Sequence, residues 1–271
     1  MDLRVDGHVI VVTGATSGVG RAVAERLAAE GARLVLVARG ADRLAALAAE
    51  LEPTAGGAPR PRHVTVAADV TAPGAGGRIV GAARDALGRI DAIVAAAGAT
   101  RRASPEELTA EDWDAQWRIN VLAPHALLLA ATEDLAVAPD GGRVVLVSSS
   151  SGKRPSASNM AYSVTKAAQL SLSRAWADRL AGRGVRVNAV TPGPLDSEMW
   201  LDPGGLADQT AAATGASRDE ALRIARGRVP LGRFGTPDEI ADVIALLASP
   251  RAGFVTGAAW SSDGGSVPGI V

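Results

Sequence analysis

Short apolar runs alternate with longer amphipathic stretches along most of this 271-residue chain. The runs with the length and composition of strands lie at residues 9–13, 33–38, 64–67, 90–96, 142–148 and 185–190. Such alternation predicts βα units and therefore a parallel sheet flanked by helices. A further short strand is expected near residues 258–261. We predict one α/β domain over residues 1–271, with a doubly wound parallel sheet of about seven strands.

The amphipathic stretches predict the helices of these units. They lie at residues 18–30, 41–51, 110–135 and 159–181, with one more that ends near residue 87. Another helix begins at Thr236, where T-P-D-E supplies an N-cap, a proline and two acids. Residues 52–62 hold three prolines and two glycines and predict an exposed loop. Residues 191–235 are rich in Gly and Pro, with one helix near 218–226, and we interpret 194–229 as a loop or lid over a substrate.

The composition argues against several classes of function. The net charge is -1, with acids and bases interspersed, so no basic face for nucleic acid is expected. No apolar run reaches the ~18 residues of a membrane span, and residues 1–12 lack the cleavage site of a signal peptide. We therefore expect a cytoplasmic protein. There is no cysteine, and His8, His63 and His125 lie far apart in the sequence, so no metal site is predicted.

A glycine-rich turn follows the first predicted strand. Residues 13–20 read T-G-A-T-S-G-V-G and open the first helix. Glycines let the backbone turn tightly and approach a phosphate, and the helix N-terminus supplies N–H donors and a positive dipole. This strand–turn–helix context predicts that the pyrophosphate of a dinucleotide docks here. The alternative is a turn of the same shape that binds no ligand.

The only tyrosine, Tyr162, stands four residues before Lys166, one of two lysines in a chain whose other basic residues are arginines. That spacing puts both side chains on one face of a helix. An ammonium group there would lower the pKa of the phenol from its reference value of about 10 and make it a usable general acid/base. Taken alone, the pair is equally compatible with a surface tyrosine beside a solvated lysine.

The two motifs occur together with Ser149, thirteen residues before Tyr162. The combination T-G-x-x-x-G-x-G, Ser and Y-x-x-x-K resembles the classical short-chain dehydrogenase/reductase family, over about residues 6–265. The resemblance implies a Rossmann-type fold. It also implies an oxidoreductase that transfers a hydride between a nicotinamide cofactor and a carbonyl or secondary alcohol.

Four catalytic residues follow from the resemblance: Asn120, Ser149, Tyr162 and Lys166. The asparagine would interrupt its helix and connect through water to the lysine. The serine would bond the substrate oxygen, with Ser148 and Ser150 as open alternatives. The tyrosine would exchange a proton with that oxygen. The lysine would lower the pKa of the tyrosine and bond the nicotinamide ribose.

The resemblance also implies a set of residues that contact the cofactor. They are Gly14, Thr16, Ser17, Gly18, Val19, Gly20, Arg39, Asp69, Val70, Ala97, Gly98, Tyr162, Lys166, Pro192, Gly193, Leu195 and Ser197. Asp69 would accept from the adenine amino group. The second strand ends at Ala38 and Arg39, with a cation where NAD enzymes place an acid, and Ser17 would add a hydrogen bond. A 2′-phosphate would be attracted there, so NADP(H) is predicted over NAD(H).

One departure from the family pattern is clear. After the fourth strand the family usually has N-N-A-G or N-A-G, but this chain has alanine at 95, 96 and 97 before Gly98. The missing asparagine usually bonds the backbone, which leaves a backbone group for water or another side chain to satisfy. Local stability and cofactor affinity are therefore in doubt, whereas the four catalytic positions are intact.

The substrate is expected to contact Ser149, Tyr162 and Trp200. Trp200 would close over the substrate or simply pack onto the core. Lys153 and Arg154 would select an anion or be solvated. The resemblance implies a homotetramer or homodimer joined through helices 110–135 and 159–181 and through the C-terminal strand. Two rival functions remain: a non-catalytic cofactor-binding or regulatory protein, and an enoyl reductase, which usually spaces its Tyr and Lys more widely.

Overall fold

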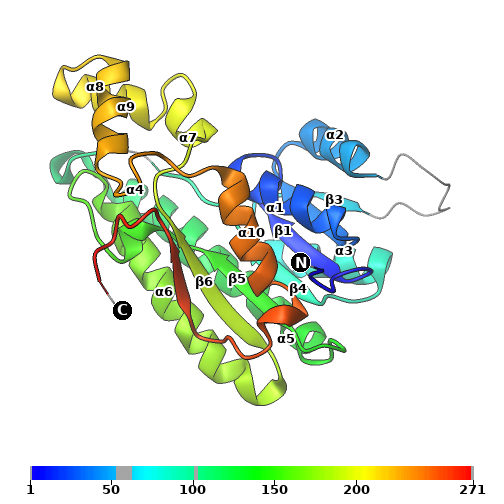
Figure 1. Ribbon diagram of the computed structural model, residues 1–271. Helices are drawn as coiled ribbons and strands as arrows, with labels where there is room; N and C mark the ends of the chain where they lie inside the picture. The colour runs from blue at the N-terminus through cyan, green and yellow to red at the C-terminus, as the bar shows by residue number, and fades with distance from the viewer. Residues whose placement is uncertain (1, 53–62, 101–102, 270–271) are drawn as a thin grey trace.

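The computed structural model describes residues 2–52, 63–100 and 103–269, so most of the loop predicted at 52–62 lies outside the described residues. One sheet contains seven parallel strands in the order β3-β2-β1-β4-β5-β6-β7 (Figure 1). The strands are β1 Val9–Thr13, β2 Arg33–Ala38, β3 Val64–Ala67, β4 Ala92–Ala95, β5 Arg143–Val147, β6 Arg186–Pro192 and β7 Ala259–Ser262. The strand order reverses between β1 and β4, which confirms the predicted doubly wound sheet.

Ten α-helices occur in the described part of the chain. They are α1 Gly18–Ala29, α2 Ala41–Leu51, α3 Ala75–Leu87, α4 Ala110–Trp117, α5 Ala123–Ala136, α6 Met160–Leu180, α7 Glu198–Leu201, α8 Leu206–Thr214, α9 Arg218–Gly227 and α10 Pro237–Leu247. Among these helices, none is both long enough and apolar enough to cross a membrane.

Helices cover both faces of the sheet because its strands are apolar on both faces. Successive residues of a strand point to opposite sides. Accordingly, Ile10 and Val12 of β1 join the core under α1, α2 and α10, while Val9 and Val11 join the core under α3, α5 and α6. This double burial explains why the strands are continuous apolar runs rather than alternating ones.

The stretch predicted as one helix at 110–135 is interrupted in the structure. Between α4 and α5 lies a π turn, Arg118–Leu122, in which the N–H of Ala123 donates to the carbonyl of Arg118 five residues back. Such a turn holds one residue more than an α-helical turn and is frequent at functional sites. Asn120 lies inside it and is fully buried.

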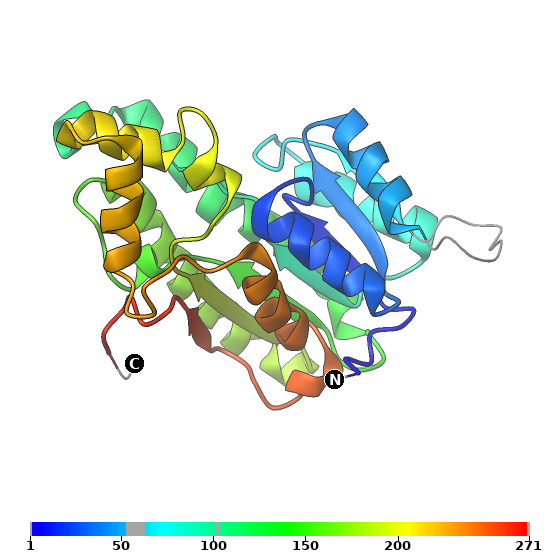
Figure 2. The ribbon, with the colours of Figure 1, turned by 45° about the horizontal axis from the view of Figure 1, so that its top comes forward.

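The segment after β6 contains three helices rather than the single one predicted near 218–226. Figures 1 and 2 show α7, α8 and α9 as a cluster set apart from the sheet, beyond the end of β6. The helix α8 reads L-A-D-Q-T-A-A-A-T and buries only Ala207, so its apolar periodicity is too weak to predict it.

Candidate active site

A pocket of about 490 Å³ opens at the carboxyl ends of the strands, where a doubly wound sheet binds its ligand. Every residue predicted to contact a cofactor lines this pocket, and so do Ser149 and Trp200. Asn120 does not line it. Residues that the sequence did not single out also line the wall, among them Arg43, Asn159 and Glu198. The residues predicted from motifs far apart in the sequence therefore meet at one site.

The glycine turn has the shape needed to hold phosphates. Gly14 has φ +69°, and a Cβ on it would lie 3.0 Å from the backbone N and Cα of Ala97. A Cβ on Gly20 would overlap the carbonyl of Gly14. The first turn of α1 contains no acid, and no side chain caps it. The N–H groups at this helix start therefore remain available to a pyrophosphate, so the residues present fit a dinucleotide.

The adenosine end of the pocket carries two exposed arginines, Arg39 and Arg43. Within the described residues, neither has an ion-pair partner. Asp69 lies near Arg39, and hydrogen bonds from the backbone and side chain of Thr71, with the Arg39 charge as a smaller cause, lower the pKa of its carboxyl. One Asp69 oxygen already accepts both Thr71 bonds, at 2.9 and 2.7 Å, so the other is left for an adenine amino group.

The structure distinguishes the three candidate serines. Ser148 is buried, and its hydroxyl donates to the carbonyl of Lys166 at 3.0 Å. Ser149 Oγ accepts from the N–H of Ser151 at 3.1 Å and lies close enough to the Tyr162 hydroxyl to lower the pKa of that phenol. Ser150 lines the pocket at the start of a 3-10 turn, and no hydrogen bond of its side chain occurs among the described residues. Ser149 is therefore the serine placed beside the phenol.

Tyr162 and Lys166 lie together, but burial shifts the pKa of each so that its neutral form is favoured. The ammonium nitrogen is 5.6 Å from the centre of the tyrosine ring. Burial raises the pKa of Tyr162, and the hydrogen bond from Ser149 only partly opposes it. Burial also lowers the pKa of Lys166 to about 7, so its charge is present only part of the time at neutral pH. The expectation of a lowered tyrosine pKa is therefore wrong for this state of the site.

Asn120 faces the lysine from the π turn. Its amide nitrogen donates to Gln116 at 3.0 Å and to Thr165 at 3.1 Å, whereas its buried oxygen has no hydrogen-bond partner among the described residues. A Cβ on Gly98 would lie 3.7 Å from that oxygen and 3.8 Å from Lys166 Nζ. The amide oxygen and the ammonium group therefore both lie beside Gly98.

The hydroxyl of Thr13 accepts a hydrogen bond from the backbone beside the alanine run. The N–H of Ala97 donates to Thr13 Oγ1 at 3.1 Å, from β1 to the end of β4. Thr13 is itself buried. The side chain of a neighbouring strand thus satisfies a backbone group that the missing asparagine had left in question.

We predict that Thr13→Val lowers the free energy of unfolding by about 1–3 kcal/mol, because the isosteric valine leaves the Ala97 N–H without its acceptor. Chemical denaturation measures the loss. Thr132→Val is the matched control, since its hydroxyl bonds only the carbonyl of Leu128 in its own helix. Equal effects of the two changes would contradict a special role for Thr13.

The far end of the pocket is polar. Thr100 and Asn159 hydrogen-bond to each other, at 3.1 and 2.8 Å, and Ser156 and Ser158 are 3.0 Å apart. Trp200 both lines the pocket and packs on Phe234, with ring centres 4.8 Å apart, so each of its predicted roles has a contact to support it.

Lys153 and Arg154 lie outside this wall. Lys153 Nζ donates to the carbonyl of Ala259 and to Ser261, and Arg154 donates to the carbonyl of Ser266. Both therefore attach the loop before α6 to the C-terminal segment rather than selecting an anionic substrate.

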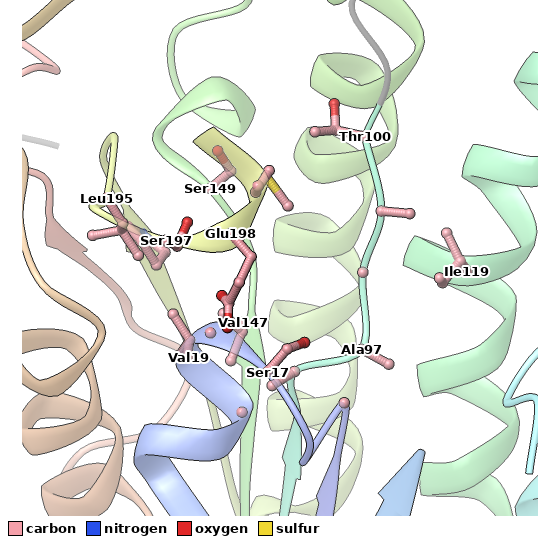
Figure 3. Close-up of a pocket in the computed structure, with 18 of the residues that line it drawn as sticks. Ser17, Val19, Ala97, Thr100, Ile119, Val147, Ser149, Leu195, Ser197 and Glu198 are labelled. Atoms are coloured by element: carbon pink, nitrogen blue, oxygen red, sulfur yellow. The ribbon is translucent and has the colours of Figure 1, made fainter. Parts of the chain in front are cut away.

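Glu198 is an unexpected feature of the pocket. Figure 3 shows its side chain reaching from the neighbourhood of Ser197 toward the glycine turn at Ser17 and Val19. Its Oε2 lies 3.6 Å from the point that a Cβ on Gly18 would occupy. A carboxylate and a phosphate repel each other at such separations, so this side chain has to turn aside when a pyrophosphate docks.

In the part of the chain that the structure describes, no three His, Cys, Asp or Glu residues are grouped as metal ligands.

Comparison with known proteins agrees with this geometry. Residues 14–266 match a protein-family model described as enoyl-(acyl carrier protein) reductase. A 3-oxoacyl-[acyl-carrier-protein] reductase of Thermotoga maritima is 33% identical, over 98% of this chain and 100% of its own length. A D-threitol dehydrogenase of Mycolicibacterium smegmatis is 36% identical, over 97% and 94% respectively. The structure of L-sorbose reductase from Gluconobacter frateurii, complexed with NADPH and L-sorbose, matches with a TM-score of 0.90 and 31% identity over 100% of both chains.

Proposed function

The chain belongs to the short-chain dehydrogenase/reductase family of oxidoreductases, and we propose that it interconverts a ketone and a secondary alcohol with NADP(H). The observation that carries the proposal is the grouping of Ser149, Tyr162 and Lys166 beside a glycine-lined pocket that fits a dinucleotide. Carbonyl reduction needs one group that bonds the carbonyl oxygen and another that donates a proton to it. The serine and the tyrosine supply these two groups side by side.

In this proposal each residue acts on the substrate oxygen or on the proton. The Ser149 hydroxyl holds the oxygen, and Tyr162 gives it a proton during reduction or takes one during oxidation. Lys166, when charged, stabilises the phenolate that results. A bound nicotinamide supplies or accepts the hydride. The oxygen of Asn120 and the ammonium group of Lys166 both lie beside Gly98, and a proton lost by the tyrosine would be replaced from that side.

The preference for NADP(H) rests on Arg39 and Arg43. Both line the adenosine end without an ion-pair partner among the described residues. The residue directly after β2 is Arg39 rather than an acid that would bond a ribose hydroxyl. The L-sorbose reductase that shares this fold was solved with NADPH, in agreement with the proposal.

We further propose a substrate that carries additional hydroxyl groups. The amide of Asn159 and the hydroxyl of Thr100 form a polar pair in the pocket wall, with Ser156 and Ser158 beside it. Two of the relatives, by their names, act on D-threitol and L-sorbose, which are polyhydroxylated. An enoyl reductase usually spaces its Tyr and Lys more widely than Tyr162 and Lys166 are spaced here.

Asn159→Leu is predicted to raise KM for a hydroxylated ketone about tenfold, since it removes one or two hydrogen bonds of roughly 1 kcal/mol each. Its amide does not cap α6, so the helix start remains intact. Steady-state kinetics with a cyclic ketone that lacks other hydroxyls provide the control and should show little change. An equal loss on both substrates would contradict hydroxyl recognition by this residue.

A homodimer or homotetramer is proposed from the apolar residues that remain exposed. Of the four leucines between residues 122 and 129, Leu127 and Leu128 are buried in the core, whereas Leu122 and Leu129 are 48% and 61% exposed. Trp260, on the edge strand β7, is 37% exposed. Large apolar residues exposed on these elements are typical of a surface that another subunit covers.

The test of the function is a substrate panel followed by the absorbance of the reduced nicotinamide. It should include L-sorbose, D-threitol, a 3-oxoacyl thioester and an enoyl thioester, each with NADP(H) and NAD(H). We expect turnover of a hydroxylated ketone or alcohol with NADP(H). Turnover of the enoyl thioester alone would refute the carbonyl assignment.

A further inference from the structure

We propose that Gln169 is a positioning residue for Lys166, because its amide oxygen fixes the direction in which the buried ammonium group presents its remaining N–H. The inference rests on the proposed function, which assigns a catalytic role to Lys166. Gln169 Oε1 lies 3.1 Å from Lys166 Nζ, and the two residues are 1% and 3% exposed. They are three residues apart on α6 and so share one face of it.

The ammonium group has three N–H donors, and two of them are held. One donates to the carbonyl of Val147 at 2.8 Å and the second to Gln169. Because Val147 contributes only its backbone, Gln169 is the one side chain in the described structure that hydrogen-bonds Lys166. With two directions fixed, the third N–H is left for the side where Gly98 and the tyrosine ring lie.

The chemistry of an amide suits this place. An ammonium group only donates, so the amide must present its oxygen rather than its nitrogen. This oxygen stabilises the charged lysine without neutralising it, as a carboxylate would. Burial lowers the pKa of Lys166 to about 7, so the charged and neutral forms of the lysine have similar populations at neutral pH. Removing one hydrogen-bond acceptor from the ammonium group changes the ratio of the two forms.

Among the described residues, no charged side chain shifts the pKa of Lys166. The elements packed around Lys166 Nζ contribute the carbonyl of Val147 from β5, Gly98 after β4 and the Asn120 amide from the π turn. None of these titrates. Of the described residues, only Tyr162, on the same helix, is a titratable neighbour, and burial is the sole cause of the lowered lysine pKa.

A second observation places the glutamine in the part of the fold where the sequence departs from its family. A small cavity is bordered by Thr13, Ala95, Ala97, Ile119 and Gln169, among others. The end of β4 supplies only alanines there. An amide reaches this region from α6 instead, and it reaches the catalytic lysine.

The chain is well suited to a direct measurement, because it contains only two lysines. Protein labelled with ¹³C at the lysine ε-carbons gives two side-chain signals, and Lys153→Arg assigns them. The position of the Lys166 signal is followed against pH without cofactor or substrate. The variants are Gln169→Leu, which removes the acceptor, and the isosteric Gln169→Glu, which adds a charge. Ser173→Ala is the control, since it removes a buried, unpartnered hydroxyl one turn further along α6.

We expect the Lys166 midpoint to fall by about one pH unit in Q169L, to rise by about as much in Q169E, and to stay in S173A. The alkaline limb of kcat should move in the same directions. An unchanged midpoint in Q169L, or shifts of equal sign in Q169L and Q169E, overturns the proposal. If Q169L does not fold, Q169E decides: a raised midpoint supports the proposal and an unchanged one overturns it. Failure of the proposed function would appear separately, as wild-type protein that turns over no carbonyl.

Discussion

Replacing Tyr162 with phenylalanine is expected to lower kcat about a thousandfold, the scale of general acid–base catalysis. The ring would still fill its place, but the hydroxyl bonded to Ser149 would be gone. Nothing in the glycine turn or at Arg39 changes, so the cofactor should bind with nearly unaltered affinity. Stopped-flow turnover and cofactor fluorescence measure the two quantities separately. Val164→Ala, two residues on at an exposed position of α6, is the control and should leave kcat unchanged.

This experiment also separates the enzyme from its rival, a non-catalytic protein that keeps a cofactor for regulation. In the rival case the wild type would have no turnover for the substitution to remove. Retention of most of the turnover in the phenylalanine variant would show instead that another group moves the proton. Because the serine, tyrosine and lysine are all present, we expect turnover by the wild type and its loss in the phenylalanine variant.

Replacing Arg39 with aspartate is expected to reverse the choice of cofactor. Loss of a charge-assisted bond of about 1.5–3 kcal/mol to the 2′-phosphate weakens NADP(H) binding by about tenfold to a hundredfold. The new carboxylate repels that phosphate and supplies the partner that a ribose 2′-hydroxyl needs. The ratio of kcat/KM for the two cofactors measures the change. Because Arg43 would still attract the phosphate in the single variant, the double variant Arg39→Asp/Arg43→Ala should complete the reversal.

Arg228→Asp is the matched control, because it makes the same change of charge at an exposed residue that does not line the pocket. It should leave the ratio as it is. A wild-type protein that uses NAD(H) at least as well as NADP(H) would refute the assignment before any variant is made. If Arg39→Asp leaves the ratio of kcat/KM for the two cofactors unchanged, the 2′-phosphate does not bind at Arg39.

The sheet was predictable from the sequence because its strands carry their own signal. The central strands β1, β2 and β4 to β6 are mainly apolar runs, because burial on both faces removes most polar residues from them. The glycine turn was equally visible, since Gly14 and Gly20 are needed where backbones nearly touch. The short helix α8 was missed because its alanines and threonines define no apolar face.

The site was only partly predictable, for a different reason. Motif residues such as Tyr162 and Ser149 have fixed spacings, so the sequence alone can place them. Gln169, Asn159 and Arg43 belong to no motif, and their part in the site depends on which side chains the fold brings next to them. The pKa of Tyr162 was misjudged because spacing shows the nearby lysine but not the burial of both groups. Desolvation depends on the packed structure and not on separation along the chain.

The π turn before α5 also constrains how this chain can vary in length. The turn Arg118–Leu122 holds one residue more than an α-helical turn, so deletion of one residue there would join α4 and α5 into one continuous α-helix without rotating α5. Leu127, Leu128 and Leu135 would keep their places in the core that they share with α3, whereas Asn120 would lose the wide turn that places it near the lysine. A one-residue deletion at this turn is therefore expected to preserve the packing of α5 and to displace Asn120, whereas the same deletion within α5 would rotate the rest of that helix by about 100°.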